Sequence, residues 1–394
     1  MNKRIVTKYR DGILTAVYEN DRFTLFNWER PDRESLIGNI YVGRVNKVVP
    51  GIQAAFVDVG DGLTGYYSLT DNPVHLYLSE GKHDRLKEGD MILVQVERDP
   101  VKTKMMVLTG KLNLTGRYVA LTCGYPGLSF SSKLKGGQYK ELKDQVRDAL
   151  SDFPTADYAL IVRTNGKTVG PETIQKEAYA LLERLEKIKK DALYRTAGCL
   201  MMTVPAGWLQ DIRDSRDDEL DEILTDDKDI FDQLTEFMHE SCPSLTERLR
   251  FYSDDYPLAK LYRLETELEQ ALSERVWLKS GGFLVIQPTE AMTVIDVNTG
   301  KFIGKKNAEE TFLKLNLEAA KEIALQIKLR NLSGIIIVDF IDMEAEESRQ
   351  ELMRQLDILL LNDQIKTTLV DMTKLGLVEI TRKKVRKPLA EQLR

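Results

Sequence analysis

Apolar and polar residues alternate most regularly in the C-terminal third of the chain. Two β-branched runs, Met292–Val297 and Gly334–Asp339, each end close to a carboxylate, Asp296 in the first and Asp339 in the second. The residues from about 308 to 329 carry apolar side chains at helical spacing. A strand, a crossover helix and a second strand place two strands side by side, so we expect the carboxylates to lie close together. The alternative is that both aspartates are strand-end caps or turn formers.

The first 35 residues alternate between apolar and polar in two short runs, Ile13–Val17 and Phe23–Phe26. Asn20 and Asp21 lie between the runs and favour a turn, so the pattern predicts a β-hairpin. Because a hairpin is too short to form a domain, we expect it to pair with strands from later in the chain.

From Gly38 to about Thr115 the chain changes to closely spaced short strands with glycines at the bends. The predicted strands are 39–45, 54–59, 65–69 and 91–96. Several short strands with glycine corners are typical of a small closed barrel of the OB type. The segment resembles an S1 RNA-binding domain in Ala54-Ala-Phe-Val-Asp-Val-Gly60, Gly65-Tyr-Tyr67 and Glu88-Gly-Asp90. Phe56, Tyr66 and Lys104 are the candidates for gripping single strands, with the barrel core as the alternative place for both rings.

A predicted strand, Tyr158–Arg163, runs into Thr164-Asn-Gly-Lys167 and then a long helix from about residue 171 to 190. Arg163 and Thr164 at this strand end offer a guanidinium, a hydroxyl and turn amides to a phosphate. A plain hairpin-like turn with a solvated arginine is the alternative, and the local pattern alone favours it.

Residues 209–272 are first acidic and then helical, and the remainder of the chain alternates strands with helices. Further strands are predicted at 283–286, 368–372 and 377–380, and a further helix at about 345–361. This pattern indicates an α/β layered domain.

Composition describes an ordinary globular protein of 394 residues, 42% hydrophobic and 30% charged, which is long enough for two to four domains. The net charge of −6 argues against a nucleic-acid partner only at first sight. Residues 209–230 hold ten acidic residues against three basic ones, so the remaining chain is close to neutral. Local basic surfaces such as Arg382–Lys387 are therefore compatible with binding RNA.

The chain has no apolar run long enough to span a bilayer and no signal peptide at its start, so we expect a cytoplasmic protein without a membrane segment. Cys123, Cys199 and Cys242 are scattered and form no CxxC pair, which indicates neither a disulfide framework nor a zinc site.

Over nearly its whole length the chain resembles the catalytic half of the ribonuclease E/G endoribonucleases. The matching segments include Asn39-Ile-Tyr-Val-Gly, Leu160-Ile-Val-Arg-Thr164, Ser280-Gly-Gly282, Thr289-Glu-Ala291, Ile295-Asp-Val-Asn298, Asn316-Leu-Glu-Ala-Ala320 and Ile337-Val-Asp-Phe-Ile-Asp-Met343. The resemblance implies an α/β multidomain chain: a split RNase H-like domain (1–35 and 206–273), an inserted S1 barrel of the OB type (36–115), a 5′-sensor segment (116–205) and a DNase I-like α/β catalytic domain (274–394).

The resemblance also implies roles for single residues. Asp296 and Asp339 match Mg²⁺ ligands, with Mn²⁺ as the alternative metal, and Asn298 matches the residue that fixes the carboxylates or the scissile phosphate. The pocket for an RNA 5′-monophosphate maps onto Arg163, Thr164, Gly116 and Ala120, where the family more often has a larger aliphatic residue than Ala120. The S1 residues that grip single-stranded RNA map onto Phe56, Tyr66 and Lys104; Tyr66 replaces a Phe and keeps its stacking face.

Family members usually continue into a Cys-Pro-x-Cys motif that shares a zinc ion between two chains. This sequence ends at Arg394, about where that motif would begin, so we expect no zinc and no zinc-linked assembly. A homodimer through other surfaces and a smaller oligomer both stay open.

The function expected from these features is Mg²⁺-dependent endonucleolytic cleavage of single-stranded RNA in RNA processing and decay. We expect 3′-hydroxyl and 5′-phosphate ends and a preference for 5′-monophosphorylated substrates. One rival is a non-catalytic RNA-binding protein of the S1 type, acting in RNA regulation or ribosome maturation. Another is a metal phosphodiesterase with a different substrate, which the S1-like barrel disfavours.

Overall fold

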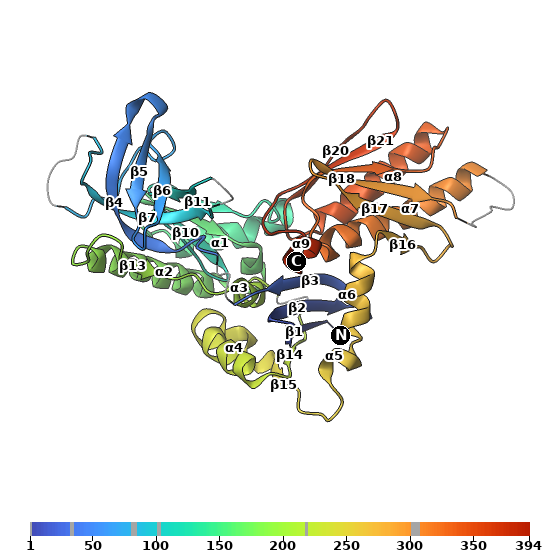
Figure 1. Cartoon of the computed structure of the whole chain (residues 1–394), viewed down its shortest axis with the longest axis horizontal. Coiled ribbons are helices and arrows are strands. Elements are labelled where there is room, and N and C mark those ends of the chain that lie inside the picture. The colour runs from blue at the N-terminus through green and yellow to red at the C-terminus, as the bar shows by residue number, and fades with distance from the viewer. Residues whose placement is uncertain (1, 32–34, 80–84, 101–103, 217–219, 301–307) are drawn as a thin grey trace. The chain divides into compact units, whose positions relative to one another are not determined.

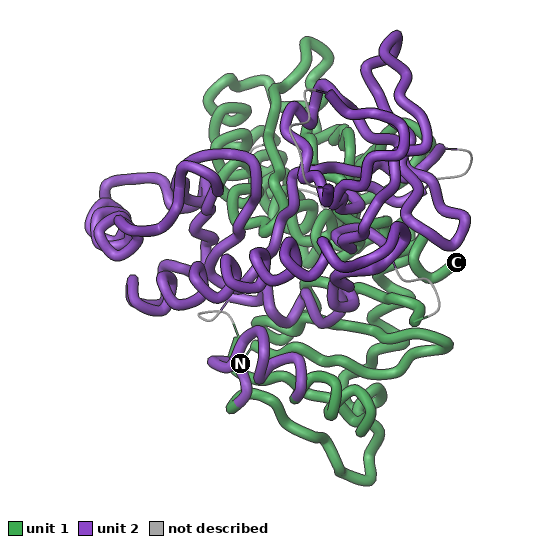
Figure 2. Tube along the Cα trace, turned by 90° about the vertical axis from the view of Figure 1, so that its left-hand side faces the viewer, with its two compact units in different colours: residues 1–31, 220–235, 247–394 green, residues 32–219, 236–246 purple. Residues whose placement is uncertain are grey.

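The structure is a computed structural model that describes residues 2–31, 35–79, 85–100, 104–216, 220–300 and 308–394. The chain forms two compact units, which are coloured separately in Figure 2. The first unit consists of Met1–Pro31, Leu220–Thr235 and Glu247–Arg394, and the second of Asp32–Glu219 and Glu236–Thr246. The first unit therefore combines segments that are far apart in the sequence, and one of these segments, Leu220–Thr235, separates the two parts of the second unit.

The first unit contains a five-stranded sheet of order β15-β14-β1-β2-β3. Its strands are β1 (Lys3–Tyr9), β2 (Gly12–Glu19), β3 (Arg22–Glu29), β14 (Glu222–Thr225) and β15 (Leu249–Phe251). The predicted hairpin is β2–β3, and its turn residues Asn20 and Asp21 have positive φ angles of 51° and 62°, which short polar residues tolerate. Because β1 pairs in parallel with β14, the expected pairing of the N-terminal strands with a later segment is confirmed.

Short helices supply apolar side chains to the core of this sheet. Leu258, Leu264 and Leu389 are fully or almost fully buried and join the cluster formed by Ile5, Leu14 and Phe26. These helices are α5 (Leu258–Leu261), α6 (Leu264–Leu272) and α9 (Leu389–Gln392), while α4 (Lys228–Ser241) begins in the first unit and ends in the second.

The first unit also contains a six-stranded sheet of order β16-β17-β18-β19-β21-β20 (Figure 1). Its strands are β16 (Arg275–Trp277), β17 (Phe283–Pro288), β18 (Met292–Asn298), β19 (Gly334–Asp339), β20 (Thr367–Met372) and β21 (Leu377–Arg382). Two helices, α7 (Ala308–Leu329) and α8 (Glu346–Leu361), share a core with alternate residues of these strands, among them Ile295 and Val338. The α/β layer predicted for this region is present, and its second face carries Asp296 and Asp339 together with partly exposed apolar side chains such as Ile335.

The second unit contains a closed five-stranded barrel. The strands are β4 (Ile40–Val49), β5 (Ala54–Asp58), β6 (Thr64–Ser68), β7 (Met91–Arg98) and β8 (Met106–Thr109). They follow the order β4-β5-β6-β8-β7, and pairing of β7 with β4 closes the barrel. The predicted barrel of the OB type is confirmed at this level, although the sequence pattern did not single out β8.

A four-stranded sheet of order β11-β12-β10-β9 lies in the same unit. The strands are β9 (Asn113–Thr115), β10 (Val119–Cys123), β11 (Gly127–Phe130) and β12 (Tyr158–Val162), and the helices are α1 (Lys140–Ala149), α2 (Pro171–Ala192) and α3 (Gly207–Arg213). A further strand, β13 (Leu200–Met202), pairs with β4. A 3₁₀ turn, Thr164–Thr168, and then α2 follow β12, so the alternative of a hairpin-like turn after this strand is wrong.

No helix in the described part of the chain is both long enough and apolar enough to cross a membrane.

Candidate active site

The two predicted carboxylates meet at the end of a pair of parallel strands. β18 and β19 pair in parallel, and Asp296 lies directly opposite Asp339. Their neighbours Ile295 and Val338 are completely buried on the other face of the sheet, while both aspartates are exposed. Because residues directly opposite one another share a face, the two carboxylates project to the same side. The connection between the strands is α7, the crossover helix that parallel pairing requires.

Asn298 and Asp342 add polar side chains to this pair. Asn298 donates a hydrogen bond from Nδ2 to Oδ2 of Asp296, 2.6 Å away. Burial, followed by the negative charges of Asp296 and Asp342, raises the pKa of Asp339 above its ordinary value. Among the described residues, no lysine or arginine forms an ion pair with Asp296 or Asp339. The site therefore gathers negative charge that its own described side chains do not neutralise.

This donor set fits a hard divalent cation. No group of three or more His, Cys, Asp and Glu side chains suited to a metal is found among the described residues. Mg²⁺ needs only one or two protein carboxylates, because it retains several waters. Asp296 and Asp339 could therefore serve as ligands, and a cation between them would offset the charge repulsion that, after partial burial, raises the pKa of Asp339.

Helix α7 holds the segment that follows β19. Asn316, a completely buried residue of α7, donates from Nδ2 to the carbonyl of Ile341 (2.8 Å) and accepts the Ile341 N–H on Oδ1 (3.1 Å). Nearer the start of the helix, the carboxylate of Glu309 accepts the backbone N–H groups of residues 344 and 345 at 3.0 and 3.1 Å. These four bonds fix the backbone on both sides of Asp342.

In the second unit, Arg163 follows β12 and is bonded through Nη1. This nitrogen donates to the Gly116 carbonyl and to Oδ1 of Asp214, which is 2.8 Å away. Nε and Nη2 of Arg163 make no hydrogen bond within the part of the chain that the structure describes. A planar edge with two donors is the arrangement with which a guanidinium binds a carboxylate or a phosphate. The solvated arginine of the alternative is not observed, since the side chain is 25% exposed and ion-paired.

Asp214 lies between two guanidinium groups. Nε of Arg213, a buried side chain, is 2.8 Å from Oδ1 of Asp214. Burial by itself would raise the pKa of Asp214, but the hydrogen bond from Arg163 and the charges of both arginines outweigh it and lower the pKa to about 2. Asp214 is therefore ionised at neutral pH and orients Arg163.

The other residues of the predicted phosphate pocket lie around the same strand ends. Thr164 Oγ1 is 3.0 Å from the hydroxyl of Ser131.

Gly116 lies against Glu177, because a Cβ on Gly116 would be 2.6 Å from Cδ of Glu177. The Glu177 carboxylate accepts the N–H groups of residues 117–119 at 2.7 to 2.9 Å. The close contact with Glu177 thus explains why position 116 is a glycine, whether or not a phosphate binds here. Ala120 is half-buried on β10, opposite Thr115.

The aromatic residues predicted on the barrel point away from its core. Phe56 on β5 lies directly opposite Tyr66 on β6, and their ring centroids are 6.4 Å apart in an edge-to-face arrangement. Both rings are half-exposed, whereas the next residue, Tyr67, is completely buried inside the barrel. The alternative that Phe56 and Tyr66 are barrel-core aromatics is therefore wrong. Lys104 is exposed two residues before β8.

Comparison with known proteins identifies the family to which the chain belongs. Residues 113–385 match the sequence profile described as Ribonuclease E/G family. The chain is 34% identical over 381 residues to Ribonuclease G of Escherichia coli, covering 93% of this chain and 76% of that protein. It is 36% identical over 393 residues to Ribonuclease G of Haemophilus influenzae, covering 96% and 78%. Ribonuclease E of a Nostoc species is 34% identical over 354 residues, covering 88% of this chain and 51% of that protein.

The chain belongs to the ribonuclease E/G family. The resemblance found in the sequence is thereby confirmed, and so is the prediction that the chain is an enzyme of the ribonuclease class.

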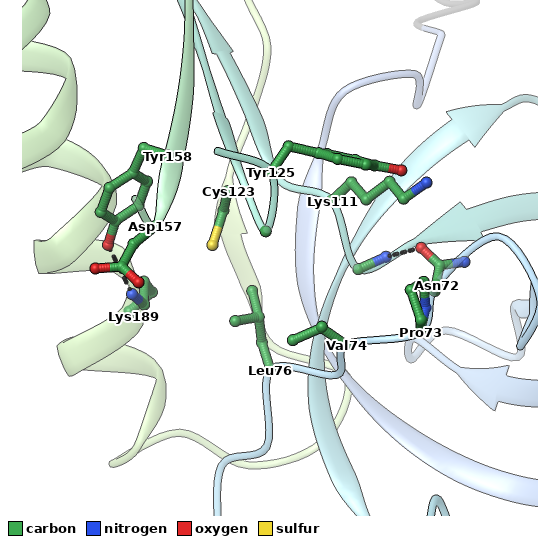
Figure 3. A pocket seen from close by; sticks show the side chains of 12 residues that line it. Asn72, Pro73, Val74, Leu76, Lys111, Cys123, Tyr125, Asp157, Tyr158 and Lys189 are labelled. Carbon is green, nitrogen blue, oxygen red and sulfur yellow. Dashed lines mark hydrogen bonds between the residues drawn. The ribbon is translucent and has the colours of Figure 1, made fainter. Parts of the chain in front are cut away.

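The second unit of this ribonuclease E/G family member also has a cavity of about 310 Å³, shown in Figure 3. At one end the Lys111 ammonium lies 4.5 Å from the ring centroid of Tyr125. At the other end Lys189 donates to the Tyr158 hydroxyl (3.0 Å) and to Glu186 (2.9 Å). The cavity contains none of the predicted residues, and both of its lysines already have partners.

Sequence reasoning missed three polar residues that the structure places at these sites. Asn316 interrupts the apolar face of α7, and an amide at a buried helical position is a signal that could have been used. Asp214 was hidden in the acidic stretch, where nothing distinguishes it from its neighbours. Glu177 is a half-buried residue of α2, and only the fold shows that its carboxylate accepts hydrogen bonds from the backbone beside Gly116.

Proposed function

We propose that this chain is a metal-dependent endoribonuclease that cleaves single-stranded RNA at a site formed by Asp296, Asp339 and Asn298. One observation carries the proposal: the two aspartates lie directly opposite each other on parallel strands, exposed and without a cationic partner among the described residues. Unpaired carboxylates of this kind are ligands for Mg²⁺, with Mn²⁺ as the alternative. The family of the chain supplies the substrate class, RNA.

In this proposal the residues of the chain have separate tasks. A divalent cation held here would activate a water for attack and would offset negative charge on the scissile phosphate. Asp296 and Asp339 hold that cation on the open face of the sheet. Asn298 orients Asp296 through its Nδ2 hydrogen bond, and Asn316 and Glu309 keep the segment around Asp342 in place. We propose 3′-hydroxyl and 5′-phosphate ends as products, in RNA processing and decay.

We further propose that Phe56, Tyr66 and Lys104 bind the single strand on the barrel. Two half-exposed rings that face one another across neighbouring strands suit stacking with bases, and an exposed lysine suits the backbone. A cavity of about 820 Å³ within the second unit is lined by Tyr66 and also by Thr115 and Arg213. This cavity supports an RNA path from the barrel toward the strand ends that carry Arg163.

A preference for a 5′-monophosphate is the finer part of the proposal. Arg163 offers Nε and Nη2, and Thr164 offers a hydroxyl. Ala120 and Gly116 lie on the adjacent strand β10 and just before it. Because Asp214 occupies Nη1 alone, the free edge of Arg163 is the part that a terminal phosphate can reach.

We also propose a division of the chain into domains. The parallel pairing of β1 with β14 supports a split RNase H-like domain formed by residues 1–35 and 206–273. The two-layer arrangement of the six-stranded sheet with α7 and α8 supports a DNase I-like catalytic domain in residues 274–394. The barrel (36–115) and the 5′-sensor segment (116–205) are the inserted parts.

The test compares wild type, Asp296→Ala and Asp339→Ala on a 5′-monophosphorylated single-stranded RNA with Mg²⁺. We expect internal cleavage by wild type and loss of cleavage in both variants with RNA binding retained. Equal cleavage by all three proteins would refute the assignment of the site. Binding without cleavage by wild type would favour the rival, a non-catalytic RNA-binding protein of the S1 type.

A further inference from the structure

Three side chains at the edge of the six-stranded sheet form a compact aromatic and cationic cluster. The rings of Trp277 on β16 and Phe283 on β17 have centroids 5.2 Å apart and are tilted by 56°. The Arg275 guanidinium lies 4.5 Å from the Phe283 centroid and 5.7 Å from the Trp277 centroid. We call Arg275, Trp277 and Phe283 the edge cluster.

The register of the strands relates the edge cluster to the carboxylates. Trp277 lies opposite Phe283, and Phe283 lies opposite Asn298. In the same way, the strand pairs place Arg275 in line with Val285, Asp296 and Asp339. Residues in such lines project to one face of a sheet. The edge cluster therefore shares a face with the proposed metal ligands, and neighbouring strands are about 5 Å apart.

The cluster is not used in packing the core. Trp277 is 63% exposed, whereas the other two tryptophans of the chain, Trp28 and Trp208, are 8% and 4% exposed. The core of this sheet lies on its other face, where Leu284 is completely buried. Within the described part of the chain, no carboxylate pairs with the Arg275 guanidinium. An exposed aromatic surface beside an unpaired cation is suited to binding a partner.

We propose that the edge cluster binds an unpaired base of single-stranded RNA next to the scissile phosphate. The proposal rests on the proposed endoribonuclease function. Trp277 supplies the exposed face on which a base stacks, Phe283 packs against the Trp277 ring, and Arg275 reaches the adjoining backbone phosphate. A nucleobase is the occupant, because a cation held on two rings complements a polyanion that carries planar bases. The cluster thereby contributes to the choice of the bond that is cut.

Fluorescence gives a readout that is independent of cleavage. Trp277 is the only exposed tryptophan of the three, so a base stacked on it should quench a distinct part of the emission. A 5′-monophosphorylated single-stranded RNA is titrated into Asp339→Asn with Mg²⁺, and into the same protein carrying Trp277→Phe. We expect saturable quenching in the first protein and its loss in the second. Absent quenching, or equal quenching in both proteins, would overturn the proposal.

Cleavage kinetics locate the stacked base. Trp277→Ala should lower kcat/KM by about tenfold on ordinary RNA, since stacking on one aromatic residue contributes on this order. Trp277→Phe should retain most of the activity. Tyr256→Ala is the matched control, because Tyr256 is an aromatic residue of the same unit with 57% exposure.

A substrate without a base next to the cleaved bond completes the test. Wild type should lose about the same factor on this abasic RNA, and Trp277→Ala should lose no more. If the abasic RNA and the Trp277→Ala substitution each lower kcat/KM and the two factors multiply when combined, stacking of that base on the edge cluster is contradicted. If wild type cuts no RNA, the proposed function fails, and the quenching result still decides whether the cluster binds RNA. If cleavage depends on Asp339 but not on Trp277, the inference fails alone.

Discussion

The Asp296–Asp339 site and the Arg163–Asp214 site satisfy their charges in opposite ways. Asp339 faces other carboxylates, and its pKa is raised by burial and by their charges. Asp214 faces two arginines, which lower its pKa to about 2 despite its burial. The carboxylates of the first site have no cationic partner among the described residues, whereas the Asp214 carboxylate of the second site is paired with two arginines, and one donor edge of Arg163 makes no hydrogen bond to the described residues. Substitutions at the first site should therefore change the cleavage rate without lowering stability. Substitutions at the second site should change both the substrate preference and the stability.

The largest effect should come from Asp339→Asn. If Asp339 is the metal ligand that we propose, loss of its charge should lower the cleavage rate by at least about a hundredfold, since even partners beyond the ligands change metal affinity by up to this factor. Thermal unfolding should shift slightly upward or not at all, because the substitution removes like-charge repulsion. Initial rates and thermal unfolding measure the two effects. Asp357→Asn on α8 is the control, and a strongly lowered unfolding temperature in Asp339→Asn would contradict unpaired charge at this site.

Asn316→Ala tests how far the carboxylate site depends on its supporting helix. The variant leaves the N–H and the carbonyl of Ile341 without their partner, which should cost about 2 to 4 kcal/mol of unfolding free energy. Displacement of the segment around Asp342 should lower cleavage by about tenfold. Urea unfolding and initial rates check both. Gln355→Ala, which loses an amide that donates to Glu351 one turn earlier on α8, should change neither, and an equal effect in both variants would refute the supporting role.

Arg163→Gln tests the Arg163–Asp214 site. The ratio of cleavage rates for 5′-monophosphorylated over 5′-hydroxyl RNA should fall by about tenfold, because a charge-assisted hydrogen bond to the phosphate is lost. Stability should also fall by about 1 kcal/mol, since Asp214 loses one of its two partners. Arg147→Gln removes an exposed pair with Asp144 in the same unit and should change neither quantity. An unchanged ratio in Arg163→Gln would remove Arg163 from phosphate binding.

The smallest effect is a difference in how stability depends on pH. The folded pKa of Asp214 is about 2, below its ordinary value of 3.8, so its contribution is present at neutral pH and is lost as the pH falls through about 2. Asp339 has the opposite sign: its raised pKa destabilises the folded state above the ordinary pKa, and this penalty disappears in acid. Asp214→Asn should be about 1 kcal/mol less stable than wild type at pH 7 and converge with it near pH 2.

Asp339→Asn should be slightly more stable than wild type at pH 7 and equal to it in acid. Urea unfolding at several pH values measures both variants. Curves that run parallel to that of wild type would show that neither carboxylate has the proposed surroundings.

Local patterns predicted the elements that carry both sites. Two β-branched runs separated by a helical repeat led to β18, α7 and β19, and the turn at Asn20-Asp21 led to the hairpin β2–β3. Periodicity reports which face of an element is buried, and loop chemistry reports where the chain reverses. Both depend on neighbouring residues only. The pairing of Asp296 with Asp339 followed from them, because parallel strands joined by a crossover align their ends.

Charge partners could not be predicted in this way. Arg382 was taken as part of a basic surface, yet it is 3% exposed and ion-paired with Asp363 at 2.7 Å. Strands β14 and β15 lie in a segment that reads as acidic and helical, and they are strands because β1 supplies a partner for β14. In each case the deciding neighbour lies on another element, outside the local pattern of the sequence.

The alternation of apolar residues and the chemistry of the turns were sufficient to predict the strand–helix–strand unit, the closed barrel and the meeting of Asp296 with Asp339. Only the fold shows that Asp214 pairs with Arg163, that Glu177 binds the backbone beside Gly116, and that the edge cluster lies on the same face of the sheet as Asp296 and Asp339. The physical reason is that a charge or a ring acts through distance and burial. Those quantities are set when distant segments pack together, whereas the alternation of apolar residues is already present in each segment.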